Sequence, residues 1–295
     1  MKSFRAPVFV LLAGILWGSM GLFVRQLNAA GLYAIDVVQI RYLLATLFVG
    51  LYLLVFHRDK FRIRLRDLWC FLGTGLCSLL FFSWCYFTGM SVTTLSVMSV
   101  LLYTAPVFVM LMSSLLFHER LTMQKLLALA LSVGGCVLVS GPGSIQLGAK
   151  GLLLGLGAGF GYALYSIFGR YAIDRGYDSW TITFYSFLVC ALGCAALSDW
   201  RTIAAVLLPD AGLIGSSAAM ALFTGFLAYI FYTKGLEGMP SSRASILASV
   251  EPVTATLLGT LLFHEPLSWT GIAGIALVLS AIAVLSIHRP KTGQE

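Results

Sequence analysis

Long apolar runs are the feature of this sequence that most restricts its fold. A bilayer core of about 30 Å is crossed by roughly 20 residues of apolar α-helix, and ten runs approach that length. We therefore expect an all-α integral membrane protein with ten transmembrane helices. The ten runs cover residues 6–24, 35–56, 68–88, 93–117, 126–140, 151–168, 180–197, 211–233, 244–263 and 269–287.

The composition excludes several other classes of protein. The chain is 59% hydrophobic and 11% charged, whereas a typical soluble domain is about 25% charged. Such apolar content excludes disorder, and no polar stretch is large enough to fold as a separate soluble catalytic domain. The net charge of +7 does not indicate nucleic acid as a partner, because the basic residues lie in short segments between apolar runs.

The basic residues fall mainly on one side of the expected membrane. If successive runs alternate in direction, fifteen of the 19 Lys and Arg residues share the side of the N-terminus, three lie on the other side, and Arg41 lies within the second run. The positive-inside rule then places both termini in the cytoplasm. We expect a multi-pass protein of the plasma or inner membrane.

The sequence also contains an internal repeat. Residues 115–121 (LLFHERL) recur as residues 261–267 (LLFHEPL) with an offset of 146, and the same offset pairs Pro106 with Pro252. Residues 1–145 and 146–295 then hold five runs each. Because five is odd, the second half enters the membrane from the opposite side. We expect one transmembrane domain of two inverted five-span repeats, an arrangement typical of alternating-access transporters.

A set of short motifs carries a resemblance to a known family. They are Trp17-Gly18-Ser19, Arg41-Tyr42-Leu43-Leu44-Ala45, Pro106 with Glu119, and Glu251-Pro252 with Glu265. In their order, spacing and duplication the chain resembles the drug/metabolite transporter (DMT) superfamily, in particular the ten-span EamA family, over essentially its whole length. The resemblance implies a helical basket with both termini inside and a central substrate pathway, used largely for metabolite efflux. It does not imply which metabolite.

Glu251 is the sharpest candidate for a substrate-binding residue. A carboxylate within an apolar helix is costly, and such groups usually mark ion or substrate pathways. It would titrate a coupled proton or contact a cationic group; the alternative is a fixed hydrogen bond that holds the helix start. Its repeat partner, Ala105, is apolar, so the two halves are expected to differ in role.

Aromatic residues within the runs are further candidates for substrate contact. Their faces stack on planar groups or hold cations by cation–π attraction of about 0.5–2 kcal/mol, although most aromatics in a bundle simply pack. The candidates are Trp17, Tyr86, Tyr103, Tyr162 and Tyr229.

Two prolines are candidate hinges. Pro106 and Pro252 would each remove a backbone donor and free the carbonyl four residues earlier, on Leu102 and Ala248. A freed carbonyl in the membrane must be satisfied by protein, water or ligand. The alternative is a static kink that shapes the bundle.

Three charged residues are assigned structural or gating roles. Arg41 would snorkel to the outer surface or pair with an acidic neighbour such as Asp36 or Glu251, with binding of a substrate carboxylate as the alternative. Glu119 and Glu265 end the fourth and ninth runs and would brace loops or gates.

Taken together, these features favour a secondary transporter, not an enzyme. We expect export of a small amphiphilic metabolite, amino-acid-like or cationic, by alternating access. An intramembrane enzyme acting on a lipid-linked substrate and a channel are the alternatives. No Walker A motif and no metal-like His or Cys spacing occurs, so we expect no cofactor, metal or catalytic residue. The partners would be the substrate, the lipid bilayer and a coupled proton, and the oligomeric state is left open.

Overall fold

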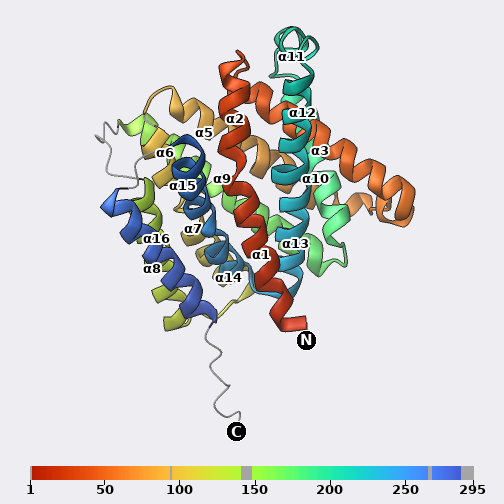
Figure 1. The fold of residues 1–295 in the computed structure, drawn as a ribbon. Coiled ribbons are helices and arrows are strands. Elements are labelled where there is room, and N and C mark those ends of the chain that lie inside the picture. The colour runs from red at the N-terminus through yellow and green to blue at the C-terminus, as the bar shows by residue number, and fades with distance from the viewer. Residues whose placement is uncertain (1, 94, 141–147, 265–267, 287–295) are drawn as a thin grey trace.

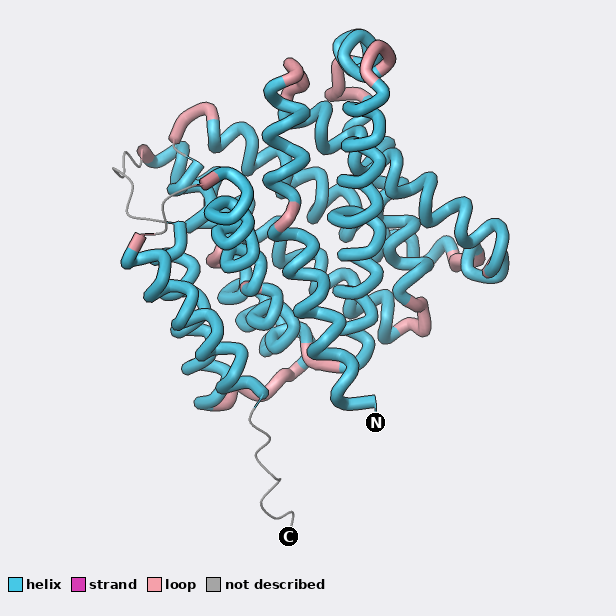
Figure 2. Tube along the Cα trace, in the orientation of Figure 1, coloured by secondary structure: helices cyan, strands magenta, loops and turns pink. Residues whose placement is uncertain are grey.

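The structure, a computed structural model, describes residues 2–93, 95–140, 148–264 and 268–286. Every regular element in these ranges is helical (Figure 2). The first part of the chain forms α1 (Lys2–Gly18), α2 (Met20–Ala29), α3 (Ala34–Phe56), η1 (Arg58–Phe61), η2 (Leu65–Asp67), α4 (Leu68–Leu72), η3 (Gly73–Leu80), α5 (Phe81–Met90), α6 (Leu95–Leu102), α7 (Ala105–Phe117) and α8 (Met123–Ser140). The remainder forms α9 (Ala149–Asp174), α10 (Ser179–Ala195), α11 (Trp200–Leu207), α12 (Ala211–Met220), η4 (Ala221–Leu227), α13 (Ala228–Gly238), α14 (Ser241–Ala248), α15 (Val250–Phe263) and α16 (Trp269–Ser286).

Acidic side chains begin several of these helices. Asp178 accepts a hydrogen bond from the Thr181 backbone N–H at 3.0 Å and starts α10. Asp210 accepts from the Gly212 and Leu213 N–H groups at 2.8 and 3.1 Å and starts α12. A carboxylate at the N-cap satisfies otherwise unpaired N–H groups and is favoured by the helix dipole. These aspartates explain why the helices start where they do.

The described part of the chain contains seven helical stretches that are long and apolar enough to cross a membrane. They are Arg5–Ala29, Ala34–Phe56, Leu65–Met90, Val97–Phe117, Ala149–Asp174, Ala211–Gly238 and Ser241–Phe263. An eighth is possible if α10 and α11, which meet at 106°, form one broken span. The expected count of ten differs from this count because α8 and α16 are shorter apolar helices and because α10 ends before its apolar run does.

Three of these spans have a short break between α-helices. The first is broken at Ser19, between α1 and α2. The other two breaks lie near the middle of the bundle. The α-helix stops after Leu102 and restarts at Ala105, and it stops again after Ala248 and restarts at Val250. Pro106 and Pro252 therefore lie in the first turn of a new helix, where a missing N–H costs little, and not in the interior of a continuous kinked helix as predicted. Two π-helical segments, η3 and η4, interrupt two further spans.

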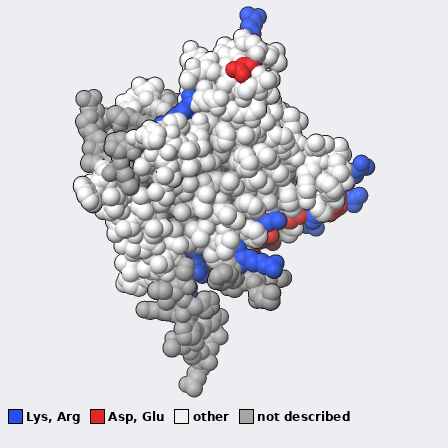
Figure 3. Space-filling view, viewed as in Figure 1, with Lys and Arg blue, Asp and Glu red and all other residues white. Residues whose placement is uncertain are grey.

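The basic loops gather at the end of the bundle where α1 begins and α16 ends (Figure 1). Lys60 pairs there with Asp178, with Nζ and Oδ2 2.8 Å apart. Arg243 donates to the Leu285 carbonyl at 2.5 Å, which joins the start of α14 to the end of α16. Figure 3 shows most of the visible Lys and Arg side chains along this lower edge, below a largely uncharged surface. The basic loops therefore share one end of the molecule.

The main hydrophobic core runs through the centre of the bundle, where α1 packs against α13, α14 and α15. Close approach there depends on glycine. A Cβ atom added to Gly14 would lie 2.9 Å from the Ala248 carbonyl oxygen, and one added to Gly18 would lie 2.5 Å from the Glu251 carbonyl oxygen. Helix α1 therefore lies directly on the break between α14 and α15.

Candidate substrate site

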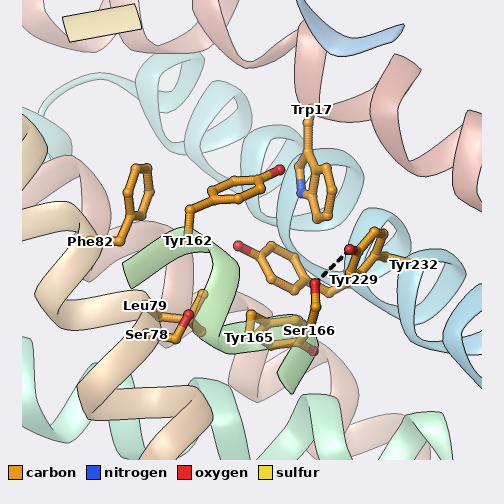
Figure 4. Close-up of a pocket in the computed structure, with 9 residues that line it drawn as sticks. All are labelled: Trp17, Ser78, Leu79, Phe82, Tyr162, Tyr165, Ser166, Tyr229 and Tyr232. Atoms are coloured by element: carbon orange, nitrogen blue, oxygen red, sulfur yellow. Dashed lines mark hydrogen bonds between the residues drawn. The ribbon is translucent and has the colours of Figure 1, made fainter. Parts of the chain in front are cut away.

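Five aromatic side chains meet at the centre of the bundle and form what we call the aromatic cluster. The cluster consists of Trp17 from α1, Tyr162 and Tyr165 from α9, and Tyr229 and Tyr232 from α13. The Trp17 ring centroid lies 5.0 Å from that of Tyr229, 5.1 Å from Tyr232 and 6.1 Å from Tyr162. The rings are mostly edge to face, a favourable geometry. They enclose a cavity of about 10 Å³ (Figure 4), which has room for about one water molecule.

Helical spacing aligns the α9 and α13 side of this cluster. Tyr162, Tyr165 and Ser166 recur at intervals of three and four residues on α9, and Tyr229, Tyr232 and Thr233 do so on α13. The Ser166 and Tyr232 hydroxyl oxygens are 2.7 Å apart, and those of Tyr165 and Thr233 are 3.1 Å apart. One turn further on, Arg170 Nη1 donates to the Leu236 carbonyl at 3.3 Å. We call these three contacts the α9–α13 seal.

A second small cavity, of about 20 Å³, adjoins the aromatic cluster. Tyr162 lines both cavities, and its hydroxyl donates to Glu251 Oε2 at 3.2 Å. Tyr103 lines the second cavity together with Ser245 and Ser249. Glu251 lies in the first turn of α15, where the helix dipole favours a negative charge. The second cavity is therefore a largely apolar recess with a carboxylate at its wall.

Arg41 places a positive charge on the other side of the aromatic cluster. The residue is 4% exposed, so its side chain does not snorkel to the surface. Its Nη2 donates to the Thr224 carbonyl in η4 at 2.6 Å, and its Cζ lies 5.7 Å from the Tyr229 ring centroid. Asp36, one expected partner, accepts instead from the Tyr33 and Asp199 backbone N–H groups. Arg41 forms no ion pair with any residue that the structure describes.

Two buried donors at this site have no hydrogen-bond partner among the described residues. They are Trp17 Nε1 and Arg41 Nε. Most buried polar groups in proteins are hydrogen-bonded, and an unpaired donor is costly. The site therefore has two unused donors, a carboxylate at Glu251 and a guanidinium at Arg41. The rings of Tyr162, Trp17 and Tyr229 connect the two charged groups.

The two helix breaks form the wall of the second cavity. Leu102 and Ala105 line it from the first break, and Ala248 and Ser249 line it from the second. A Cβ added to Gly159 of α9 would lie 2.6 Å from Thr104 Oγ1, so α9 packs on the first break as α1 packs on the second. Non-helical backbone at this depth is tolerated only where protein buries it or where it lines a cavity.

The remaining predicted residues lie away from the cavities. The Tyr86 hydroxyl contacts Ser99 Oγ at 3.2 Å, and its ring reaches Tyr162 only through Phe82. Glu119 follows the end of α7 and contacts the start of α14. Glu265 lies outside the described residues.

Sequence reasoning missed several residues that complete the site. Ser166 lies one helical turn after Tyr162 and could have been found from that spacing. Ser245 and Ser249 precede Glu251 by six and two residues, but only the break in the helix brings them to the same cavity. Thr224 supplies a backbone carbonyl, and no property of its side chain indicates that role.

Comparison with known proteins identifies relatives of this chain. The model of the EamA-like transporter family matches residues 5–141 and again residues 149–287. An "Uncharacterized transporter" of Archaeoglobus fulgidus is 29% identical over 194 residues, which cover 64% of this chain and 67% of that protein. The "Uncharacterized transporter YxxF" of Bacillus subtilis is 25% identical over 296 residues, covering 96% of this chain and 90% of that one.

A solved structure titled "Crystal structure of protein" has the same fold. It superimposes with a TM-score of 0.79 at 16% identity and covers 95% of this chain and 96% of that one. The two family matches together span nearly all of the sequence. The chain is a multi-pass membrane protein that belongs to the EamA-like transporter family, within the DMT superfamily.

Proposed function

We propose that this transporter carries a small zwitterionic, amino-acid-like metabolite through the aromatic cluster, between Arg41 and Glu251. A substrate carboxylate would bind the Arg41 guanidinium and the Trp17 indole N–H. A substrate ammonium group would bind Glu251, and an apolar side chain would pack among the aromatic rings. Export by alternating access, with a proton exchanged at Glu251, is the mechanism that we favour.

The observation that carries this proposal is the separation of two charged side chains inside the bundle, of which Arg41 is buried and Glu251 is partly buried. Arg41 donates to a backbone carbonyl, Glu251 accepts from Tyr162, and the two side chains form no ion pair with one another. Buried charges that are not paired are expensive and usually functional. A ligand with one charge of each sign would satisfy both groups, and the orphaned Trp17 Nε1 and Arg41 Nε would gain acceptors.

The closed geometry supports a carrier with an occluded state. The two central cavities have volumes of only about 10 and 20 Å³, so substrate entry requires the helices to move. The α9–α13 seal separates them from a wide depression of about 540 Å³, lined by Phe117, Glu119, Arg170 and Glu237. Opening of the seal would connect that depression to the aromatic cluster and form the cytoplasmic entrance.

Glu119 is suited to hold this entrance shut. Its carboxylate accepts from the Ser241 backbone N–H at 2.9 Å, accepts a short hydrogen bond from the Ser242 hydroxyl, and pairs with Lys125 at 3.2 Å. It thus links the end of α7 to the start of α14. We infer a gating role for Glu119, and its repeat mate Glu265 would have the same role at the other end.

Several correspondences support ten spans in two inverted repeats, 1–145 and 146–295. The family model matches once in each half. His118 and His264, which are 146 residues apart, end α7 and α15 with φ of 52° and 54°. Helices α8 and α16, together with bent α10, would complete the ten spans. The basic loops gather at one end of the bundle, which supports a cytoplasmic location for both termini.

The alternatives have less support. An intramembrane enzyme would need a cluster of acidic or histidine side chains, and the described residues contain no group of three His, Cys, Asp or Glu side chains able to hold a metal. A channel would need a continuous pore, whereas the described cavities at the centre have volumes of only about 10 and 20 Å³.

Counterflow in proteoliposomes tests the proposal. Amino acids, amines and nucleosides would first be screened for thermal stabilisation of the purified protein, since a specific ligand stabilises the folded state by mass action. A stabilising amino acid should then show saturable counterflow. Flux without counterflow would indicate a channel, and chemical conversion of the ligand would indicate an enzyme.

A further inference from the structure

A basic pocket lies outside the transport pathway, at the end of the bundle where α1 begins. It has a volume of about 320 Å³ and lies between the loop of residues 57–67 and the corner that joins α9 to α10. Four cationic side chains line it: Lys60, Arg62, Arg64 and Arg175. Figure 3 shows Lys and Arg side chains gathered on the corresponding lower right part of the molecule.

The loop that forms this pocket is held in place by side chains from the α9–α10 region. The Tyr177 hydroxyl accepts from the Arg64 backbone N–H and donates to Asp67 Oδ2, both at 3.0 Å. Thr181 Oγ1 donates to the Lys60 carbonyl at 2.9 Å, and the Tyr185 hydroxyl donates to the Phe61 carbonyl at 2.7 Å. Ordering a loop costs conformational entropy. Positive-inside topology alone needs no such fixed geometry, because it depends only on the number of basic residues.

The acidic residues of the pocket region neutralise only part of its charge. Lys60 pairs with Asp178 at 2.8 Å and with Asp59, which also lines the pocket, at 3.7 Å. Arg175 pairs with Asp67 at 3.2 Å. Arg62 and Arg64 are exposed and form no ion pair with a described residue. Guanidinium groups bind phosphate oxygens through paired N–H donors. The pocket therefore has two adjacent arginines free to bind an anion.

The surroundings of the pocket place it at the level of the lipid headgroups. Leu65, next to Arg64, is 85% exposed, and Trp69 is 39% exposed. The Arg175 guanidinium lies 4.8 Å from the Trp69 ring centroid and 5.7 Å from that of Tyr171. Exposed Trp and Tyr are typical of the interface between membrane and water. A ligand at Arg62 and Arg64 would therefore have an apolar surface beside it, which suits an acyl chain.

We propose that this pocket binds the phosphate of an anionic phospholipid. The phosphodiester lies between Arg62 and Arg64, and the acyl chains run over Leu65 and Trp69. Because the loop is fastened to the α9–α10 region, the bound lipid stabilises this contact between the two halves of the chain. The proposal rests on the membrane location of the protein and is independent of the transported substrate.

Lipid-dependent thermal unfolding tests the site. The protein in neutral detergent would be titrated with phosphatidylglycerol, with phosphatidylcholine as the neutral lipid and glycerol phosphate as the free anion. Arg62→Gln/Arg64→Gln removes the two free arginines. Arg58→Gln/Arg66→Gln is the matched control, since it removes the same charge from the same loop and neither residue lines the pocket.

We expect phosphatidylglycerol to raise the Tm of the wild type and of the control. The pocket variant should bind it roughly tenfold or more weakly, because it loses the charge-assisted hydrogen bonds from two guanidinium groups to the phosphate.

Three results would overturn the proposal. Equal weakening in both double variants would show diffuse attraction to the basic loop, without a pocket. Equal stabilisation by phosphatidylcholine would show that charge is not recognised. Equal stabilisation by glycerol phosphate would show a site for a soluble anion. Both variants should keep the wild-type Tm in neutral detergent, and retention of phosphatidylglycerol in native mass spectra gives an independent readout.

Discussion

The two helix breaks at the centre have similar backbones but carry different charges. Each follows an eight-residue helix, α6 or α14, and each packs against a glycine, Gly159 or Gly14, from the other half of the chain. At the corresponding position after the break, however, the first has Ala105 and the second has Glu251. Helices α3 and α10 have their N-cap residues, Tyr33 and Asp178, 145 residues apart. At that offset the buried charge of Arg41 corresponds to the uncharged Ser186. We infer that both halves of the chain have the helix breaks that allow movement during transport. We also infer that substrate binding depends on charged residues that only one half has at each pair of positions.

Removal of Arg41 should have the largest effect. Arg41→Gln would remove the buried charge that we assign to the substrate carboxylate, and it would also weaken the bond to the Thr224 carbonyl. We expect counterflow to fall by roughly 100-fold or more, since loss of one member of a buried charged contact costs about 3–5 kcal/mol.

The repeat mate of Arg41 provides the control. Ser186→Ala removes a hydrogen bond of 2.6 Å to Thr74 Oγ1 and should reduce transport less than tenfold. Equal losses would contradict the asymmetry.

Glu251→Gln should follow, with an effect of roughly 10- to 100-fold. The amide keeps the shape and the contact with Tyr162 but neither titrates nor carries charge. If Glu251 exchanges the coupled proton, the variant should lose gradient-driven accumulation and its dependence on pH while retaining exchange. If Glu251 only binds the ammonium group, affinity itself should fall. Wild-type accumulation, affinity and pH dependence would leave Glu251 as a helix-start residue only.

Alanine at the two contact glycines tests whether the breaks are equivalent. An added Cβ would lie 2.9 Å from the Ala248 carbonyl oxygen at Gly14 and 2.9 Å from the Leu101 carbonyl oxygen at Gly159. We expect each variant to be destabilised by about 1–3 kcal/mol, as is usual for overpacking, with a lower Tm. Gly21 has nothing within 4 Å of an added Cβ, so Gly21→Ala should leave the Tm unchanged or slightly higher. A large loss at one contact glycine only would show that the breaks differ in packing too.

The prolines should have the smallest effect. Because Pro106 and Pro252 lie in the first turn of α7 and α15, Pro→Ala restores an N–H that helps the helix to continue across the break. We expect turnover to slow severalfold in either variant, with substrate affinity and Tm nearly unchanged. Turnover equal to the wild type in both variants would exclude the prolines as hinge elements and leave them a static role.

The sequence predicted the helical class, the family and most of the apolar segments, because hydrophobic length is a local property. It could not predict the breaks, since the polar residues at them, Thr104 and Ser249, are of a kind that continuous helices of this chain also contain, such as Thr46 in α3 and Ser166 in α9. The contacts of Arg41 and Glu119 could not be predicted from the sequence either. Their partners, Thr224 and Ser241, lie 183 and 122 residues away and are chosen by tertiary packing.

The candidate site was predicted in part for the same reason. Glu251, Trp17 and Tyr162 were identified because a charge or a repeated aromatic residue in an apolar run is conspicuous, and the structure brings all three to adjoining cavities. Tyr86 satisfied the same criterion, yet it faces Ser99. Residue type alone does not tell which side of a helix faces the centre of the bundle.

Binding of substrate analogues to the two charge variants tests the central claim most directly. Once an amino acid ligand is known, its affinity would be compared with those of analogues that lack the carboxylate or the amino group, for the wild type, Arg41→Gln and Glu251→Gln. Our account predicts that Arg41→Gln binds the ligand and the analogue without the carboxylate with equal affinity. It likewise predicts that Glu251→Gln binds the ligand and the analogue without the amino group with equal affinity. If both variants lose affinity by the same factor for the ligand and for both analogues, the charges do not bind the substrate and the account is wrong.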